Sequence, residues 1–282
     1  MKRQYDMESD VVFYHVIIKV PDNTLGNSAY AFDHKHKSYL RDLLFWLESI
    51  YELEVINYCI MSTHAHFVIR RERESKLSLK DVAFRFKKYK SLKEIPDART
   101  CEVRNFAKRL NDLGDFMGNL QKRFTAWYNQ QFGKRRRGQL FNHSYKAIQL
   151  KNSKALLRCL QYVELNPVRA HMVKSTADYE FCSFREIKQK TILGISLRKR
   201  IVAALQDFGF GDLSDAKIYE IYSEPLCNIE DFEAVDFLAN PELKLIYQKS
   251  SSWSSGRSIS LSNESFIIEK DRIIQGCSFH SL

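Results

Sequence analysis

The feature of the sequence that most restricts the fold is a histidine pair inside an apolar strand–turn–strand pattern. An apolar segment, Val55–Ile60, leads into the stretch His64–Phe67. Side chains on a strand alternate between its two faces, so His64 and His66 are expected to share one face. Two imidazoles on a stiff strand form half of a metal site, because histidine is a common metal ligand. The alternative interpretation is that one of them is an ordinary core or surface histidine.

The segments around the histidine pair indicate a mixed α+β fold. Val11–Val20 is rich in β-branched and aromatic residues and ends at Pro21, which is typical of a strand. Apolar residues recur at helical spacing between positions 34 and 53, so an amphipathic helix is expected there. The order strand, helix, strand, strand favours an antiparallel-rich layer over a parallel βαβ array.

Most of the remaining chain is predicted to be helical. Residues 72–117 resemble an inserted surface segment, because they are rich in Lys and Arg and are interrupted by Pro96. A helix is expected to begin near Ser153, with Asn152 or Ser153 supplying the N-cap oxygen. The other expected elements are helices at Leu79–Lys93, Cys101–Leu113, Met117–Phe132, Leu197–Phe208 and Asp215–Tyr222, a strand at Gln139–Leu150, and a loose serine-rich segment at Ser250–Ser262.

The charge balance favours a polyanionic partner. The 282 residues carry 44 Lys and Arg against 34 Asp and Glu, which gives a net charge of +10. Cations that neutralise phosphates release condensed counterions. One run of cations beside aromatic residues suits a nucleic-acid backbone, although the same run also suits a solvated turn and the aromatic residues also suit the core. The cations are Lys134, Arg135, Arg136 and Arg137, and the aromatic residues are Trp127, Tyr128 and Phe132.

Cysteine usage and hydropathy predict the compartment. The six cysteines are scattered singly, so neither a disulfide framework nor a zinc ribbon is indicated and a reducing compartment is expected. The N-terminus leads into no secretory apolar core, and no apolar run reaches the roughly 18 residues that a membrane helix needs. We therefore expect a cytoplasmic, nucleoid-associated protein with no membrane partner.

A second group of polar residues lies on the helix that begins near Ser153. Tyr162 and Asn166 are four residues apart, so they share one helix face. Their hydroxyl and amide oxygens could both point at whatever the histidines hold. The alternative is that Asn166 and Pro167 form an ordinary N-cap with proline at the first helical position, and that Tyr162 is a half-buried aromatic. The spacing alone leaves both interpretations open.

Taken together, several ordered motifs resemble those of the REP-associated tyrosine transposases. These are relatives of the single-tyrosine insertion-sequence transposases in the HUH nuclease superfamily. The resemblance covers roughly residues 11 to 187. The matching segments are Tyr14–Val16, Cys59–Ile69, Gly138–Phe141, Tyr145–Ala147 and Tyr162–Ala170.

The resemblance implies a fold and a division of the chain. The expected fold is a ferredoxin-like antiparallel sheet with helices on one face, interrupted by the insertion at about 72–117. Residues 1–190 would form the catalytic domain. Residues 191–282 would form a partly helical C-terminal extension of unknown role.

The resemblance also assigns roles to individual residues. His64 and His66 match the metal-binding pair, Tyr162 matches the nucleophile, and Asn166 matches the third ligand. The implied metal is Mg²⁺ or Mn²⁺, although ligand softness alone would favour a later transition metal. The residues implied to contact DNA are Lys134, Arg135, Arg136, Arg137, Lys146 and Arg169.

The implied reaction is cleavage and rejoining of single-stranded DNA beside a REP-like hairpin. The bound divalent ion would polarise the scissile phosphate, and tyrosine attack would give a 5′-phosphotyrosyl enzyme and a free 3′-hydroxyl. Tyr145 is the next candidate for the nucleophile. A monomer and a homodimer are both compatible with the sequence.

The sequence departs from the pattern of the family in four places. Met61-Ser62-Thr63 stands where Met-Pro-Asn is common, and Ser144 replaces an arginine that usually precedes the Tyr145–Lys146 pair. The Gly-x-x-Arg that often follows the first strand is absent, and the insertion is longer than usual. These departures leave alternatives open: a catalytically silent DNA-binding protein, another HUH enzyme such as a replication initiator or relaxase, or a metal-storage or structural α+β protein.

Overall fold

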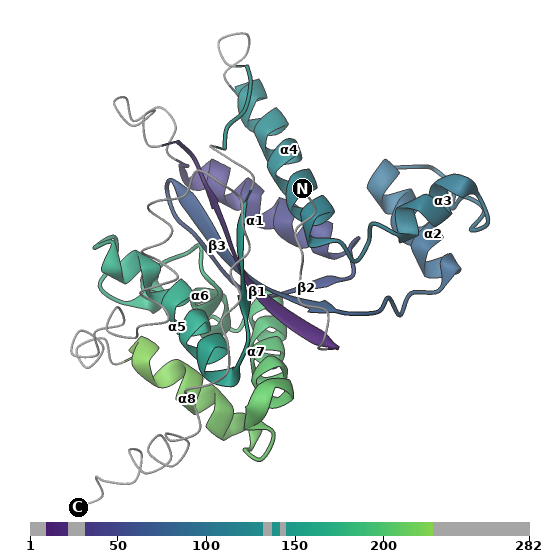
Figure 1. The fold of residues 1–282 in the computed structure, drawn as a ribbon. Coiled ribbons are helices and arrows are strands. Elements are labelled where there is room, and N and C mark those ends of the chain that lie inside the picture. The colour runs from purple at the N-terminus through teal and green to yellow at the C-terminus, as the bar shows by residue number, and fades with distance from the viewer. Residues whose placement is uncertain (1–9, 22–31, 132–136, 142–144, 228–282) are drawn as a thin grey trace, which may run out of the picture.

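A computed structural model describes residues 10–21, 32–131, 137–141 and 145–227 of the chain. Eight α-helices and four strands are assigned within these ranges, and Figure 1 shows their arrangement. The elements are β1 (Val11–Lys19), α1 (His34–Glu48), β2 (Leu53–Ile60), β3 (His64–Glu72), α2 (Leu79–Lys90), α3 (Cys101–Ala107), α4 (Leu113–Gln131), β4 (Lys146–Leu150), α5 (Ser153–Arg169), a 3₁₀ turn at Thr176–Asp178, α6 (Ser183–Lys188), α7 (Ile192–Leu205), a π-helical turn at Gln206–Phe210, and α8 (Asp215–Cys227).

The four strands form one antiparallel sheet in the order β2-β3-β1-β4. With α1 between β1 and β2, and α4 between β3 and β4, the central elements follow the βαββαβ order of ferredoxin-like folds. The predicted α+β class and the antiparallel sheet are therefore confirmed. Strand β4 begins only at Lys146, later than the predicted start at Gln139.

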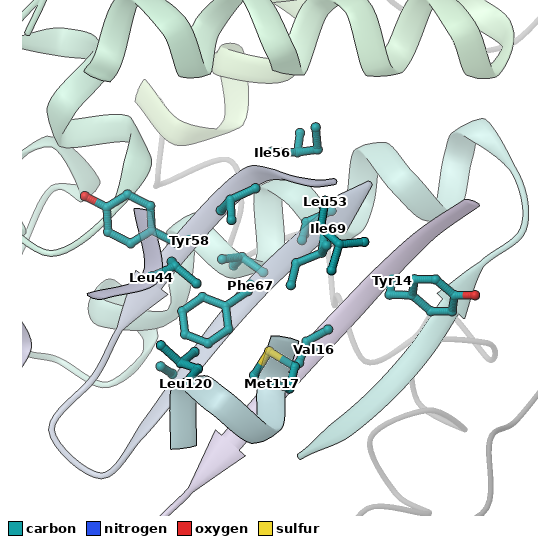
Figure 2. Packing of buried hydrophobic residues seen from close by; sticks show 14 of the residues in the cluster. Tyr14, Val16, Leu44, Leu53, Ile56, Tyr58, Phe67, Ile69, Met117 and Leu120 are labelled. Atoms are coloured by element: carbon teal, nitrogen blue, oxygen red, sulfur yellow. The ribbon is translucent and has the colours of Figure 1, made fainter. Parts of the chain in front are cut away.

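Helices cover both faces of this sheet, so the expectation of helices on one face is wrong in that respect. Helices α1 and α4 do share a face, where Leu44, Met117 and Leu120 gather around Phe67 of β3 (Figure 2). Helix α5 covers the opposite face, and α7 packs against β2 and α5. The physical reason lies in the composition of β2, a nearly continuous apolar run that is buried at every position except Glu54. Such a strand needs cover on both sides.

The predicted insertion forms a small helical hairpin that stands away from the sheet (Figure 1). Phe86 of α2 and Phe106 of α3 pack with their ring centroids 5.2 Å apart. Helix α2 begins with a capping box, in which the Ser78 hydroxyl accepts from the Asp81 backbone N–H and the Asp81 carboxylate accepts from that of Ser78. It ends at Lys90, and the C-cap residue Ser91 has a left-handed φ of 54°.

The C-terminal helices pack directly on the sheet layer. Arg200 of α7 donates to the Glu48 carboxylate at 2.6 Å and to the Val55 carbonyl at 2.9 Å. Gly194 allows α7 to approach α6 closely, because a Cβ there would lie 2.0 Å from the carbonyl oxygen of Glu186. No helix in the described ranges is long and apolar enough to cross a membrane. The predicted segment Ser250–Ser262 lies outside the described residues, and the domain boundary at 190 stays a prediction.

Candidate active site

Four ring side chains meet on the face of the sheet that α5 covers. The ring centroids of His64 and His66 on β3 are 5.0 Å apart. The ring of Tyr162 from α5 lies edge-on to His66, with centroids 5.7 Å apart. His15 on β1 completes the group, at 5.2 Å from His66 and 6.0 Å from Tyr162. The structure thus brings the histidine pair and the tyrosine together and adds a third histidine.

Strand register explains why His15 belongs to this group. His66 lies opposite Ile17 of β1, and His64 lies opposite Lys19. Directly opposed residues share a face of a sheet, and alternate residues along β1 share it too. His15, Ile17 and Lys19 therefore all face α5. His15 and Lys19 are not predicted as site residues from the sequence, because their place in the group depends on the register of β1 against β3.

A β-bulge in β2 fixes the position of α5. The register against β3 shifts between Val55 and Asn57, so Asn57 turns toward α5. Its side-chain amide donates to the Leu160 carbonyl at 3.2 Å and to the Glu164 carboxylate at 2.8 Å. Both acceptors flank Tyr162 on the helix. The bulge therefore lets β2 form hydrogen bonds that fix the turn of α5 that carries Tyr162 against the sheet.

Hydrogen bonds orient the histidine rings through their Nδ1 atoms. The Nδ1 atom of His66 lies 3.0 Å from Nε2 of His15, and the Nδ1 atom of His64 lies 3.1 Å from the Thr63 hydroxyl. Metal-binding histidines are commonly fixed by a hydrogen bond at the nitrogen that does not bind the ion. If a metal ion bound here, Nε2 would be the ligating nitrogen of each histidine in the pair.

Burial favours the neutral form of two of the three histidines, His15 and His66. It lowers the pKa of His15 to about 3. Burial also lowers the pKa of His66 well below its ordinary value, and the nearby His15 and His64 lower it further. Both shifts favour the uncharged imidazole at neutral pH. Neutral imidazole is also the form that binds a metal ion.

The segment around Pro167 is helical, so the N-cap interpretation of Asn166 is wrong. Helix α5 continues through Pro167 and ends at Arg169. Proline has no N–H to donate to the carbonyl four residues earlier, which belongs to Val163. The Asn166 side-chain amide donates there instead, at 3.3 Å, and to the Tyr162 carbonyl at 2.9 Å. The proline is thus tolerated because its neighbour satisfies the carbonyl group.

The donors implied on this face would suit an open metal site better than a closed one. Within the described residues, no cluster of three or more His, Cys, Asp or Glu side chains is placed to hold a metal ion. The set that the resemblance implies is the two imidazoles of His64 and His66 and the amide oxygen of Asn166, which shares a helix face with Tyr162. Three such ligands suit an ion that shares its coordination with water and substrate oxygens, and do not suit a closed structural site.

Cations surround the ring cluster. Lys146 of β4 lies opposite Ile17, which places it on the same face as the histidines. Burial and the charge of Lys19 lower the pKa of Lys146. The guanidinium carbon of Arg169 lies 5.2 Å from the centre of the Tyr162 ring. The structure thus places two of the predicted DNA contacts, Lys146 and Arg169, around the tyrosine and histidines and adds Lys19.

Of the remaining residues predicted to contact DNA, Trp127, Tyr128 and Arg137 lie within the described residues. Trp127 stacks on Tyr39 with centroids 3.9 Å apart, and Tyr128 is fully buried, both on the α1 and α4 side of the sheet. Arg137 is exposed. The residues Phe132, Lys134, Arg135 and Arg136 lie outside the described residues.

Comparisons with known proteins add little to this geometry. No protein-family model matches the chain, and no curated protein matches it. Among solved structures, the chain is similar to a REP-associated tyrosine transposase bound to a REP hairpin, with 15% identity and a TM-score of 0.40. The match covers 67% of this chain and 85% of that chain. These values are too low to argue for a shared function.

Proposed function

We propose that the chain is a metal-dependent HUH-type tyrosine transposase or endonuclease that acts on single-stranded DNA beside REP-like hairpins. The observation that carries the proposal is the position of the Tyr162 ring, edge-on to the His66 ring at 5.7 Å. A nucleophile, two potential metal ligands and several cations thus share one face of a rigid sheet. The monomeric and homodimeric forms are equally compatible with this site.

The proposed step forms one bond to phosphorus and breaks another. The Tyr162 hydroxyl oxygen attacks the scissile phosphate and loses its proton, while the bond from phosphorus to the 3′-oxygen breaks and that oxygen takes up a proton. The products are a 5′-phosphotyrosyl protein and a free 3′-hydroxyl. Because the phosphodiester energy is retained in the new bond, attack by a 3′-hydroxyl can rejoin strands without a nucleotide cofactor.

The residues of the chain position the phosphate and stabilise developing charge. Lys19 and Lys146 provide positive charge on the histidine face, and the guanidinium of Arg169 lies against the ring of the nucleophile. A cation beside the ring favours negative charge on the attacking oxygen. Mg²⁺ or Mn²⁺ held by His64, His66 and Asn166 would, when bound, neutralise charge on the non-bridging oxygens.

Covalent capture on labelled DNA tests the proposal. A hairpin-flanked oligonucleotide labelled at its 3′ end should give an SDS-resistant band, because the 5′ phosphate of the downstream fragment stays on the protein. The same oligonucleotide labelled at its 5′ end should give only a shortened free product. A second candidate function is that of a catalytically silent DNA-binding protein. Tight DNA binding without a labelled protein band from either oligonucleotide would support it. Within the described residues, no group of three or more His, Cys, Asp or Glu side chains is placed to hold a metal ion, which favours that candidate.

Replacing His64 with alanine is expected to lower metal-dependent cleavage by about a hundredfold or more, because even outer partners of metal ligands are worth about 10- to 100-fold in affinity or activity. The measurement is the cleavage rate across a Mn²⁺ titration, with a chelator as the zero point. His34→Ala is the matched control, since His34 is exposed on α1 and forms a surface ion pair with Glu180. Unchanged cleavage in the presence of the chelator would refute the role of the metal.

A further inference from the structure

Exposed apolar side chains are concentrated in the insertion. Seven large hydrophobic residues are exposed within the described residues, and four of them lie between positions 79 and 95. The most exposed of these is Phe84, with 59% of its surface accessible in the middle of α2. The buried face of this helix consists instead of Val82, Ala83 and Phe86. Phe84 therefore contributes little to the stability of the hairpin.

Lysines surround Phe84 on its own helix face. Lys80 lies one turn before it, and Lys87 and Lys88 lie one turn after it. No carboxylate partner of Lys80 or Lys87 is found among the described residues, whereas Lys88 donates to the Ser49 hydroxyl at 2.5 Å. Residues 79–108 carry nine Lys and Arg against four Asp and Glu, a net charge of +5 and half of the excess of the whole chain.

The carboxylate of the acidic residue in α2 is hydrogen-bonded at the N-terminus of the helix. Asp81 accepts from the backbone N–H of Ser78 at 3.2 Å and from its hydroxyl at 2.6 Å, so its carboxylate belongs to the N-terminal cap. Hydrogen bonds also fix α2 to the body of the protein. Arg85 donates to the Ile50 and Tyr51 carbonyls at 2.9 and 2.6 Å. The lysines and the ring are thus presented on a rigid support.

We propose that Lys80, Phe84, Lys87 and Lys88, the α2 face, form a second binding surface that takes unpaired single-stranded DNA. Phe84 stacks on a base, and the lysines contact the adjoining phosphates. This combination is the one expected of single-strand binding, because every base offers a flat face while the backbone offers regular negative charge. An acidic peptide would satisfy the lysines but would leave the ring without a partner. The inference rests on the proposed function only in naming DNA as the polyanion.

The α2 face lies apart from the ring cluster. Its support, α2, contacts the α1 and α4 side of the molecule, where Tyr89 donates to the Asn119 side chain of α4 at 2.7 Å. The histidines and Tyr162 lie on the opposite face of the sheet. A strand engaged at both places must therefore pass around an edge of the sheet. The α2 face would bind the DNA that flanks the cleaved phosphate, without touching that phosphate.

Binding of the full chain to a fluorescein-labelled oligothymidylate, measured by anisotropy in chelator so that no cleavage occurs, tests the proposal. Phe84→Ala should weaken binding roughly tenfold, and Phe84→Trp should preserve it. The double variant Lys80→Gln/Lys87→Gln should reduce the magnitude of the slope of log affinity against log salt by about 1.4. Each phosphate contact on a single strand contributes about 0.7 to that slope. The matched control is Lys188→Gln with Lys199→Gln on α6 and α7, which should leave the slope unchanged.

The outcomes separate this inference from the proposed function. Heparin, which has charge but no bases, should bind the wild-type chain and Phe84→Ala equally well. Equal oligothymidylate affinity of Phe84→Ala and wild type, or the same loss with heparin, would overturn the inference. Covalent capture reports on Tyr162 independently, and at saturating DNA the Phe84→Ala variant should still form the adduct. Binding that depends on Phe84, without any adduct in the wild type, would contradict the proposed function and leave the α2 face supported.

Discussion

The Tyr162→Phe variant is expected to form no covalent adduct and to cleave DNA at less than about one thousandth of the wild-type rate, because the attacking oxygen is removed. DNA binding should change little. The phenylalanine ring keeps the contacts with His66 and His15 and the position beneath Arg169. The measurement is the SDS-resistant band from a 3′-labelled, hairpin-flanked oligonucleotide, with affinity measured separately in chelator.

Tyr145→Phe is the control for this experiment. Tyr145 is the other tyrosine that the sequence offers as a nucleophile, but it is buried and its hydroxyl lies beside Gly114 at the start of α4. Helix α4 covers the face of the sheet opposite Tyr162. The Tyr145→Phe variant should therefore keep its adduct. An adduct that survives in Tyr162→Phe and is lost in Tyr145→Phe would place the nucleophile elsewhere.

Replacing Glu164 with alanine is expected to lower the free energy of unfolding by about 3–5 kcal/mol. Glu164 is fully buried two residues after Tyr162. Its carboxyl group accepts from the Asn57 amide at 2.8 Å, the Tyr222 hydroxyl at 2.9 Å and the Phe184 backbone N–H at 3.0 Å. Its removal takes away the shared acceptor of these three buried groups and breaks the hydrogen bonds by which this carboxyl group joins α5 to β2, α6 and α8.

Urea unfolding measures this loss. Glu220→Ala on α8 is the matched control, because Glu220 is exposed and forms a surface ion pair with Lys217, so its removal should cost less than about 0.5 kcal/mol. Equal stability of Glu164→Ala and the control would show that the buried network does not hold the helices together.

The stability of the wild-type chain should also depend on Glu164 through pH. Burial raises the pKa of its carboxyl group from 4.5 to about 8, although hydrogen bonds from Phe184 and Tyr222 oppose the shift. The folded chain therefore binds more protons than the unfolded chain between these values, so this group's contribution to stability falls as pH rises through that range. Glu164→Gln, which cannot titrate, should lack this slope, and an identical pH profile for both chains would contradict the assignment.

Local patterns in the sequence were sufficient for part of the site. Alternation along one strand predicts that His64 and His66 share a face, and helical spacing predicts that Tyr162 and Asn166 share another. Both predictions depend on neighbours within four residues, so neither needs the tertiary fold. The N-cap at Asn152 is equally local, and the structure confirms it, because its side chain accepts from the Ala155 N–H at 2.8 Å.

The residues that the sequence did not predict depend on pairing between distant segments. His15 and Lys19 reach the site through the register of β1 against β3, and a single-residue shift would turn both to the other face. Asn57 reaches α5 only because a bulge interrupts β2. At Asn166–Pro167 a local rule gives the wrong prediction. The pair resembles an N-cap followed by proline, but α5 continues through it because the Asn166 side chain donates to the Val163 carbonyl, which proline cannot satisfy.

The most direct test of the proposed function is the identity of the residue that becomes attached to DNA. The adduct from a hairpin-flanked oligonucleotide can be trimmed with nuclease, digested with protease and sequenced by mass spectrometry. A nucleotide linked through its 5′ phosphate to Tyr162 is the predicted result. A nucleotide on any other residue, or cleavage that leaves every tyrosine unmodified, would contradict it.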